Sequence, residues 1–345
     1  MQTGYPASPS ASTNAHLQLC FLRLTSGGFA GRGRRSNFLQ AVQKLVRSSW
    51  LAAVLLLLCI VARAQDLEPR SFSPAPVGTN FAVVSYGRTG GDVVLDPTLP
   101  ITDASASFNT ATVGYYHSFG LLGRQTSIAA GMPYVWGSGQ GLLSGVPAHI
   151  YRSGLGDLRL RLSYFLVGSP TANLQEFKKH KARTVVGADV AISVPLGQYD
   201  PNLLVNIGAN RWAFRPEIGI SRSLRSWVLE LDLGSWFFLQ NSNFFHGQVR
   251  EQAPIGSVQA HVSYTFCPGL WLALDGTYYT GGRTHVNGVR SNDLQQNSRM
   301  GATLALPLTR SQSLKLSYSK GAVTRVGGNF TSFGVTYQLR WFTRK

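Results

Sequence analysis

The sequence predicts an all-β protein, a transmembrane antiparallel up-and-down β-barrel of about twelve strands. Three observations support this fold class. Apolar and polar residues alternate along many segments, which is typical of strands with one apolar and one polar face. Charged residues make up only 14% of the 345 residues, whereas 44% are hydrophobic and 11% aromatic. After residue 65 no apolar run approaches the roughly 20 residues of a membrane helix, so a membrane crossing would have to use strands.

The alternation is clearest in residues 154–166, which read GLGDLRLRLSYFL. On a strand, the leucines from Leu158 to Leu166 fall on one face, while Arg159 and Arg161 fall on the other. Such a two-faced ribbon suits either a soluble sheet or a barrel with lipid outside and a polar lumen. In a barrel, Leu160→Arg should reduce assembly, whereas Arg161→Leu should leave the barrel folded and alter permeation or lumen pairing.

Residues 1–64 are predicted to be an N-terminal extension followed by a cleaved secretory signal. The apolar core spans residues 51–61, follows Lys44 and Arg47, and ends in an A-x-A pattern at 62–64. This core is shorter than a membrane anchor needs to be. The mature chain is then a single barrel domain, residues 65–345. Without the leader the net charge falls from +17 to +10, and no long basic run typical of nucleic-acid binding remains.

Twelve segments of the mature chain show the alternation, and charges keep to the polar phase almost throughout. The expected strands cover residues 81–88, 110–115, 125–136, 157–166, 184–195, 212–221, 228–238, 258–266, 270–278, 299–306, 314–318 and 333–341.

The connections between these segments alternate in length. Long links are expected near 89–105, 137–154, 197–210, 240–254, 281–297 and 321–329, and short ones near 119–124, 222–227, 266–269 and 307–312. Outer-membrane barrels have long external loops and short periplasmic turns, and an even number of strands returns both chain ends to the periplasm. The link at 168–183 is too long for this pattern.

The last strand has Phe333, Val335, Tyr337, Leu339 and Trp341 on one face. This alternation looks like the closing-strand signal of bacterial outer-membrane proteins. A soluble two-sheet sandwich would also alternate, but it would not need a charged face turned away from an apolar one on nearly every strand. The barrel is therefore favoured, and the bacterial outer membrane, reached after signal cleavage, is the expected location.

Three stretches carry a resemblance to a known family. They are G-L-G-D-L-R-L-R-L-S-Y from Gly154, P-L-G-Q-Y-D from Pro195 with its continuation V-N-I-G-A-N-R-W, and W-L-A-L-D-G-T-Y-Y from Trp271. They resemble the bacterial outer-membrane transporter family named for the putative MetA pathway of phenol degradation. The motif residues are Gly154, Gly156, Asp157, Leu158, Asn206, Gly208, Asn210, Arg211 and Trp212. The resemblance implies a barrel that moves or binds hydrophobic or aromatic compounds.

Thirteen charged side chains are predicted to point into the barrel. They are Asp157, Arg159, Arg161, Asp189, Arg211, Arg215, Glu217, Glu230, Asp232, Asp275, Arg299, Lys315 and Arg340. Because a buried charge must find a partner or water, these side chains can pair with one another in a network of ion pairs and hydrogen bonds. Alternatively, they line a selectivity path. Trp212 is interpreted as an outward girdle residue and Arg211 as packing under a loop, although the pair could also hold an aromatic ligand.

The sequence shows no catalytic, metal or cofactor motif. The six histidines after residue 65 lie in different segments, and neither G-x-S-x-G nor H-E-x-x-H occurs. We therefore expect no enzyme, metal or cofactor. The expected function is a transporter or channel for small hydrophobic or aromatic compounds. A non-transporting structural or partner-binding barrel, and then a barrel hydrolase, are the alternatives. The expected partners are outer-membrane lipid, the export and barrel-assembly machinery, and a small solute.

Overall fold

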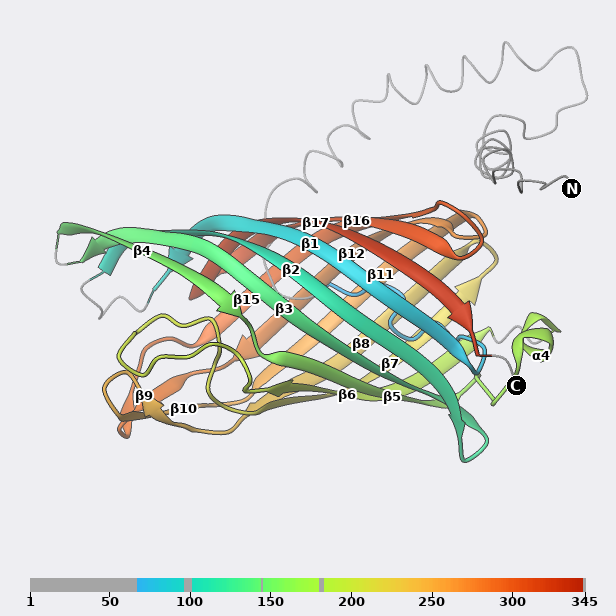
Figure 1. Ribbon diagram of the computed structural model, residues 1–345, viewed down its shortest axis with the longest axis horizontal. Helices are drawn as coiled ribbons and strands as arrows, with labels where there is room; N and C mark the ends of the chain where they lie inside the picture. Colours follow the sequence, from blue (N-terminus) through green and yellow to red (C-terminus); the bar gives the residue numbers. More distant parts are fainter. Residues whose placement is uncertain (1–66, 96–100, 144, 180–182, 344–345) are drawn as a thin grey trace, which may run out of the picture.

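The computed structural model describes residues 67–95, 101–143, 145–179 and 183–343 (Figure 1). The predicted signal segment, residues 51–64, lies outside the described residues. Within them, no helix is long and apolar enough to cross a membrane.

Strands dominate the described chain, and α4 is a short helix. The elements are β1 (Thr79–Val94), β2 (Ile101–Leu121), β3 (Arg124–Leu143), β4 (Val146–Leu155), β5 (Leu158–Val167), α4 (Leu174–Lys179), β6 (Thr184–Val194), β7 (Ala213–Leu224), β8 (Trp227–Phe238), β9 (Asn241–Phe244), β10 (Gln248–Gln252), β11 (Ile255–Cys267), β12 (Leu270–Gly281), β13 (Thr284–Val286), β14 (Val289–Arg290), β15 (Gln295–Pro307), β16 (Gln312–Thr324) and β17 (Gly327–Phe342).

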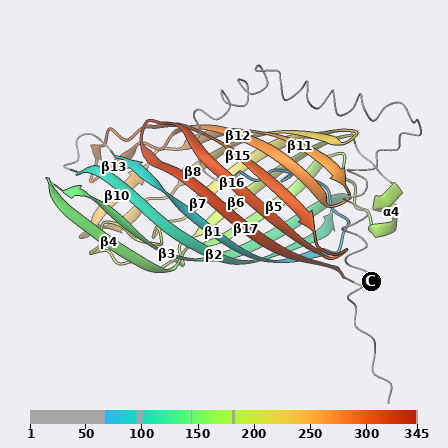
Figure 2. The same cartoon turned by 90° about the horizontal axis from the view of Figure 1, so that it is seen from above.

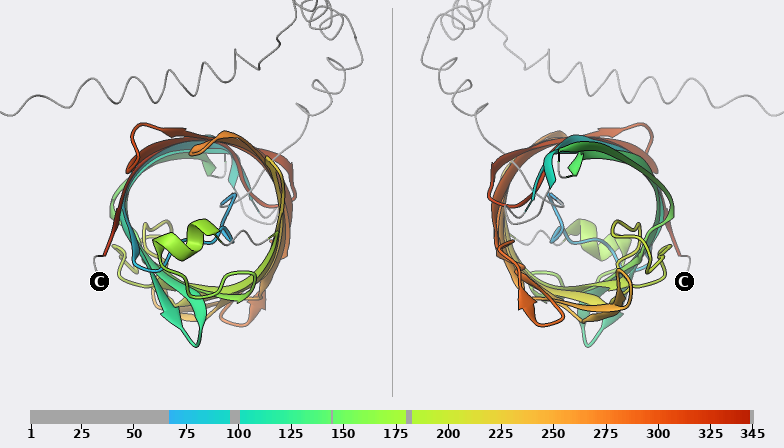
Figure 3. Two further views of the ribbon diagram at one scale, coloured as in Figure 1. Left: turned by 90° about the vertical axis from the view of Figure 1, so that its right-hand side faces the viewer. Right: turned by 90° about the vertical axis from the view of Figure 1, so that its left-hand side faces the viewer.

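The strands close into an antiparallel barrel of 12 strands, as the alternation predicted. Consecutive wall strands pair with each other, and β1 pairs with both β2 and β17, which closes the ring. β4 and β5 pair with different parts of β3 and together occupy one position in the wall. Figure 3 shows the closed ring, and Figure 2 shows the common tilt of its strands.

The first wall strand, β1, begins at the same end of the barrel at which the last, β17, stops. α4 is also at this end, whereas β4, β9 and β10 are at the other (Figure 1). The turns between β2 and β3, β7 and β8, and β11 and β12 are two residues long and belong to the end where β17 stops. By the rule of short periplasmic turns this is the periplasmic end. The opposite, outer end carries a small sheet of β9, β10, β13 and β14.

Three of the predicted long links are wrong. Most of residues 89–105, 137–154 and 321–329 belong to strands β1 to β4, β16 and β17, which extend further toward the outer end than expected. The exceptional link at 168–183 is real, and it contains α4, which lies across the periplasmic mouth of the barrel (Figure 3).

The outer surface of the wall carries the apolar face of each strand. Leu229, Leu231 and Leu233 of β8 are each more than 40% exposed, whereas the intervening Glu230 and Asp232 are buried. The same pattern holds on β7 and β11. Exposed leucines over a continuous band would be unfavourable in water and favourable in lipid. The protein is therefore an outer-membrane barrel with an apolar exterior and a polar interior.

Candidate functional site

The interior of the barrel is the candidate site, and residues 67–78 run inside it before β1 begins. Figure 3 shows this blue segment within the ring. Glu68 forms an ion pair with Arg161 of β5. Arg70 donates hydrogen bonds to the hydroxyls of Ser263 and Thr265 on β11, four strands further round the wall, at 3.0 and 2.6 Å. The segment is thus bound to two separate strands of the wall. We call residues 67–78 the lumen segment.

Phe72 anchors the lumen segment by apolar packing. Its side chain is 1% exposed and clusters with Phe165 and Val185 on the inner wall. The ring lies directly on Gly187 and Gly219, and a Cβ atom at Gly219 would come within 2.1 Å of it. Glycine at these two wall positions leaves the space that the aromatic ring fills.

A layer of ion pairs surrounds the end of the lumen segment. The Arg161 guanidinium lies 2.6 Å from a carboxylate oxygen of Asp189 and 3.1 Å from one of Glu217. Arg215 approaches the same oxygen of Glu217 at 3.5 Å. The Asp189 and Glu217 side chains are each 1% exposed, so they depend on these arginines for charge compensation. Glu68 adds a third carboxylate to Arg161.

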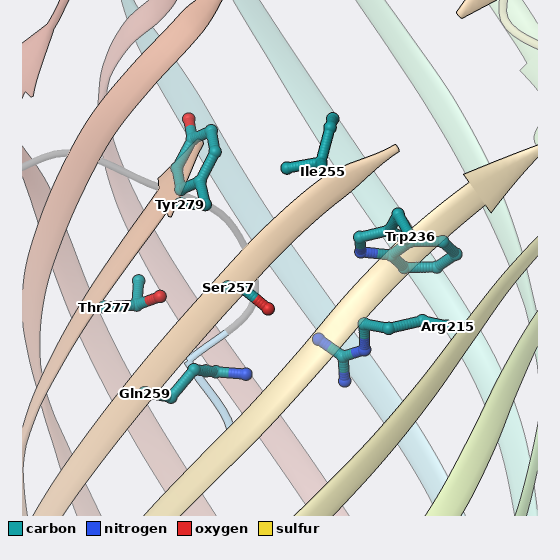
Figure 4. A pocket seen from close by; sticks show the side chains of 7 residues that line it. All are labelled: Arg215, Trp236, Ile255, Ser257, Gln259, Thr277 and Tyr279. Atoms are coloured by element: carbon teal, nitrogen blue, oxygen red, sulfur yellow. The ribbon is translucent and has the colours of Figure 1, made fainter. Parts of the chain in front are cut away.

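An aromatic cluster lies on the inner wall nearer the outer end. The rings of Trp236 and Tyr279, with the aliphatic Ile255 beside them, face a small cavity, and the Arg215 guanidinium points toward the same space (Figure 4). The Arg215 guanidinium carbon is 5.6 Å from the centre of the Trp236 ring. Ser257, Gln259 and Thr277 supply the polar part of the lining. The cavity holds about 20 Å³, close to the size of one water molecule.

A second group of titratable residues lies on the wall between the aromatic cluster and the periplasmic end. His261 of β11 is paired across the ladder with Asp275 of β12 and with Glu230 of β8. Its Nδ1 atom lies 2.7 Å from Asp275, and its Nε2 atom lies 3.5 Å from Asp232. All four side chains face inward and are buried.

The remaining predicted lumen residues are spread along the wall. Arg299 donates to the carbonyl oxygen of Phe330 at 2.9 Å, and the Lys315 ammonium lies 5.7 Å from the centre of the Trp271 ring. Arg159 is exposed. Arg340 is also exposed and donates to a backbone carbonyl in the 308–311 turn, so it lies at the periplasmic rim instead of in the lumen.

Asp157 is buried, and its carboxylate holds a loop. Its two oxygens accept hydrogen bonds from the backbone N–H groups of Gly197 and Ala209, each at 3.0 Å. Asp157 lies at the break between β4 and β5, where the N–H of Gly156 donates to the carbonyl oxygen of Pro133. The proline, which fits poorly inside a regular strand, marks the point where the partner strand is interrupted.

The neighbouring motif glycines permit close backbone contact. The ladder between β5 and β6 ends at Leu158, which pairs with Val194. From there the chain turns back, and Gln198 packs on Gly154, where a Cβ would meet its side chain at 1.9 Å. The N–H of Gln198 donates to the carbonyl oxygen of Leu155 at 2.8 Å. Residues 195–212 therefore cover the edge of β4.

The second motif stretch shapes this covering loop. Asn206 accepts from the N–H of Asp200 and donates to the carbonyl oxygens of Asp200 and Leu203, which closes a compact turn. Gly208 lies against the backbone of Gly197, and a Cβ there would come within 2.7 Å of it. The motif residues that the sequence separates by about 40 positions thus meet at one place and hold the wall together.

The side chains at the end of the loop, from Asn210 to Trp212, have different surroundings. Asn210, which has φ +50°, donates to Asn241 at 2.9 Å. Arg211 donates to Gln252 and lies over the Phe238 ring at 4.6 Å, and burial together with the nearby Arg250 lowers the pKa of Arg211 to about 10. Trp212 is 41% exposed and stacks on Phe214.

The lumen segment and the role of His261 were not anticipated from the sequence. Residues 67–78 lack any alternation and carry one aromatic residue, so only their position between the signal and the first strand could have drawn attention to them. His261 belongs to none of the sequence motifs, and its acidic neighbours come from two other strands, β8 and β12.

Similarity to known proteins is found in the structure and in a family model. No curated protein sequence is significantly similar. Among solved structures, an outer membrane channel from Pseudomonas putida F1 matches with a TM-score of 0.67 and 20% identity, covering 80% of this chain and 100% of that one. The transport unit of the autotransporter AIDA-I from Escherichia coli matches at 0.45 and 10%, covering 81% and 93%. The TodX monoaromatic hydrocarbon channel matches at 0.43 and 11%, covering 79% and 91%.

The first of these shares the fold, whereas the TM-scores of the other two do not establish it. A family model described as "Putative MetA-pathway of phenol degradation" matches residues 85–339, which include every wall strand from β1 to β17 at least in part. The chain belongs to this family.

Proposed function

We propose that this protein is a non-enzymatic outer-membrane channel for small hydrophobic or aromatic compounds. The observation that carries the proposal is the aromatic cluster on the inner wall, which consists of the Trp236 and Tyr279 rings with the aliphatic Ile255 beside them. A lumen that passes only hydrophilic solutes has no need of apolar rings facing inward, whereas aromatic solutes can stack on them. Membership of the family and the shared fold with a solved outer membrane channel support the same function.

In this proposal, the lumen segment controls the passage of solute through the barrel. The cavity beside the aromatic cluster has room for about one water molecule, so an aromatic solute requires movement of surrounding groups. A larger hollow of about 350 Å³ lies at the outer ends of β1 to β4, lined by polar residues such as Asp92, Ser107 and His149. We infer that solute enters from the outer end and meets the aromatic cluster before the lumen segment.

The proposal also covers the export of the chain and its assembly into the outer membrane. Residues 1–64 would serve as the extension and cleaved signal, leaving 65–345 as the barrel domain. The alternating aromatic face of β17 would be recognised by the barrel-assembly machinery. Mass spectrometry of the processed protein tests the first statement, because the mature chain should begin at Gln65.

The transport test compares two neighbouring aromatic residues on β8. Trp236 faces the lumen, whereas Phe237 is 46% exposed on the lipid side. Cells that carry the protein should take up a small aromatic compound faster than cells without it, and Trp236→Ala should change that rate whereas Phe237→Ala should not. Equal uptake with and without the protein, together with no conductance in planar bilayers, would leave the structural or partner-binding barrel as the better reading.

A further inference from the structure

Four ionisable side chains meet inside the barrel wall, at a level where the proposed transport path has no need of them. Glu230 and Asp232 belong to β8, His261 to β11 and Asp275 to β12. One donor atom from each of Glu230, Asp232 and His261 lies within 4.8 Å of the other two. The register of the sheet fixes this arrangement, because His261 is directly opposite Glu230 on one side and Asp275 on the other.

Several atoms of this cluster are buried without a hydrogen-bond partner. Glu230 is 5% exposed, Asp232 1% and His261 2%. Both carboxylate oxygens of Glu230, Oδ1 of Asp232 and Nε2 of His261 make no hydrogen bond that meets normal geometry, although Ser221 and the Ser71 backbone lie beside Glu230. Burying such atoms unpaired is costly. Their convergence indicates that something else binds them.

The fourth residue orients the histidine. Asp275 Oδ1 lies 2.7 Å from His261 Nδ1, and Thr303 donates to the other oxygen of Asp275 at 3.4 Å. An Nδ1–H bond to a carboxylate leaves the Nε2 lone pair free and directs it away from Asp275. Metal-binding histidines commonly have this outer carboxylate, which fixes the tautomer and the ring orientation. The free Nε2 atom faces Asp232 at 3.5 Å.

The charge of the cluster also calls for a cation. Three carboxylates are buried together, and the neighbouring Arg70 gives its hydrogen bonds to Ser263 and Thr265. Zinc ligands about 2.0–2.2 Å from the ion in a tetrahedral site lie about 3.4 Å from one another. The His261–Asp232 separation of 3.5 Å already fits, and the widest donor pair, at up to 4.8 Å, would have to close by roughly 1.4 Å.

We propose that Glu230, Asp232 and His261 bind one divalent transition-metal ion of the zinc class, with Asp275 as the outer partner of the histidine. An imidazole nitrogen with two carboxylates suits Zn²⁺ or Co²⁺, whereas Ca²⁺ and Mg²⁺ prefer oxygen ligands alone. Three protein ligands leave the fourth position for a water molecule. The bound ion joins β8 to β11 next to the lumen segment. This proposal departs from the expectation from the sequence that there is no metal.

Metal binding to the purified full chain without a histidine tag tests the proposal. After chelation and desalting, the wild-type protein should bind one Zn²⁺ per chain in calorimetry, and Co²⁺ should give the visible absorption of a low-coordinate site. His261→Ala should weaken binding at least tenfold, and Glu230→Gln, which keeps the shape of the side chain, should also weaken it. Asp275→Asn should weaken binding by about 10- to 100-fold.

His285→Ala is the matched control, because His285 lies in β13 of the outer sheet, where it pairs with Glu251. It should bind metal like the wild type. A heat-modifiable gel shift confirms that each variant is folded, and if His261→Ala fails this check, Glu230→Gln decides. The proposal is overturned if the wild type binds neither Zn²⁺ nor Co²⁺, or if folded Glu230→Gln and His261→Ala bind as well as the wild type. In that case His261 is an imidazolium held between Asp232 and Asp275.

Discussion

Asp157 Oδ1 lies 3.0 Å from the backbone nitrogen of Gly197, a residue 40 positions away in the chain. The other oxygen of Asp157 accepts from Ala209 at the same distance. In the described sheet β4 pairs with β3 alone, so the 195–212 loop takes the place of a second neighbour. One carboxylate therefore fastens the loop to the wall where the regular ladder stops.

Asp157→Ala should release this loop. Each hydrogen bond to a charged group contributes about 1.5–3 kcal/mol, and the two N–H groups would be left without their acceptor. We expect faster proteolysis within 195–212 and a lower free energy of unfolding, with the rest of the barrel intact. Asp92→Ala, which removes an exposed carboxylate on β1, is the control. Equal protease resistance of the two variants would contradict the assigned role.

Leu160→Arg should impair assembly. Leu160 lies on the lipid-facing side of β5, opposite Ile192 on one neighbouring strand and Ala130 on the other. An arginine near the bilayer midplane of a barrel costs about 2–4 kcal/mol. The heat-modifiable fraction in membranes should fall well below that of Leu160→Ala, which removes packing but adds no charge. Normal assembly of the arginine variant would mean that the two faces of β5 are assigned wrongly.

Arg161→Leu should destabilise the barrel, although the alternation alone predicts that it is tolerated. Removing one partner of a buried ion pair costs about 3–5 kcal/mol, and here Asp189 and Glu217 would both lose their closest cation. Glu68 would also be released, so conductance in planar bilayers should increase. Arg159→Leu is the control on the same face of the same strand, because Arg159 is exposed and has no ion pair with a described residue. Similar conductance of both variants would rule out Arg161 as the anchor.

Low pH should loosen the lumen segment. The Arg161 guanidinium holds the pKa of Glu68 below its ordinary value of 4.5. A lowered pKa means that the ion pair contributes its full stability above pH 4.5 and loses it as the pH falls through the lowered value. Conductance should therefore stay constant from neutral pH to about 4.5 and rise below it. Glu68→Gln should show high conductance with no step in this range, and a wild-type step near neutral pH would point to another group.

The sequence predicted the wall strands correctly where they face lipid. On β7 and β8, every second residue must be apolar because it faces acyl chains, and the alternation of Glu230 and Asp232 with Leu229, Leu231 and Leu233 shows this directly. Beyond the apolar band the requirement ends. The outer part of β1 reads Thr89-Gly90-Gly91, without an apolar stripe, and it was therefore predicted to be a loop although it is a strand.

The interior could be predicted only in part. The alternation of apolar and polar residues along each strand indicates that Arg161 and Asp275 face inward. It does not show which residues meet across strands. The His261 group depends on the register of β11 against β8 and β12, and Asp157 depends on a loop that folds back by 40 residues. The lumen segment is held by single contacts of Glu68, Arg70 and Phe72, which leave no periodic signal.

The pairing of β1 with β17 has a consequence for the order of folding. Thr79 pairs with Phe342 and Val94 with Gly327, so the seam of the barrel joins its first strand to its last over their full length. The seam can form only after the whole chain has been made. Because the lumen segment comes directly before β1, it must already lie between the two edges when they meet, or it must be threaded into a finished ring. The first route avoids pulling Glu68 and Arg70 through a closed wall, so the segment and the seam should become protected together during folding.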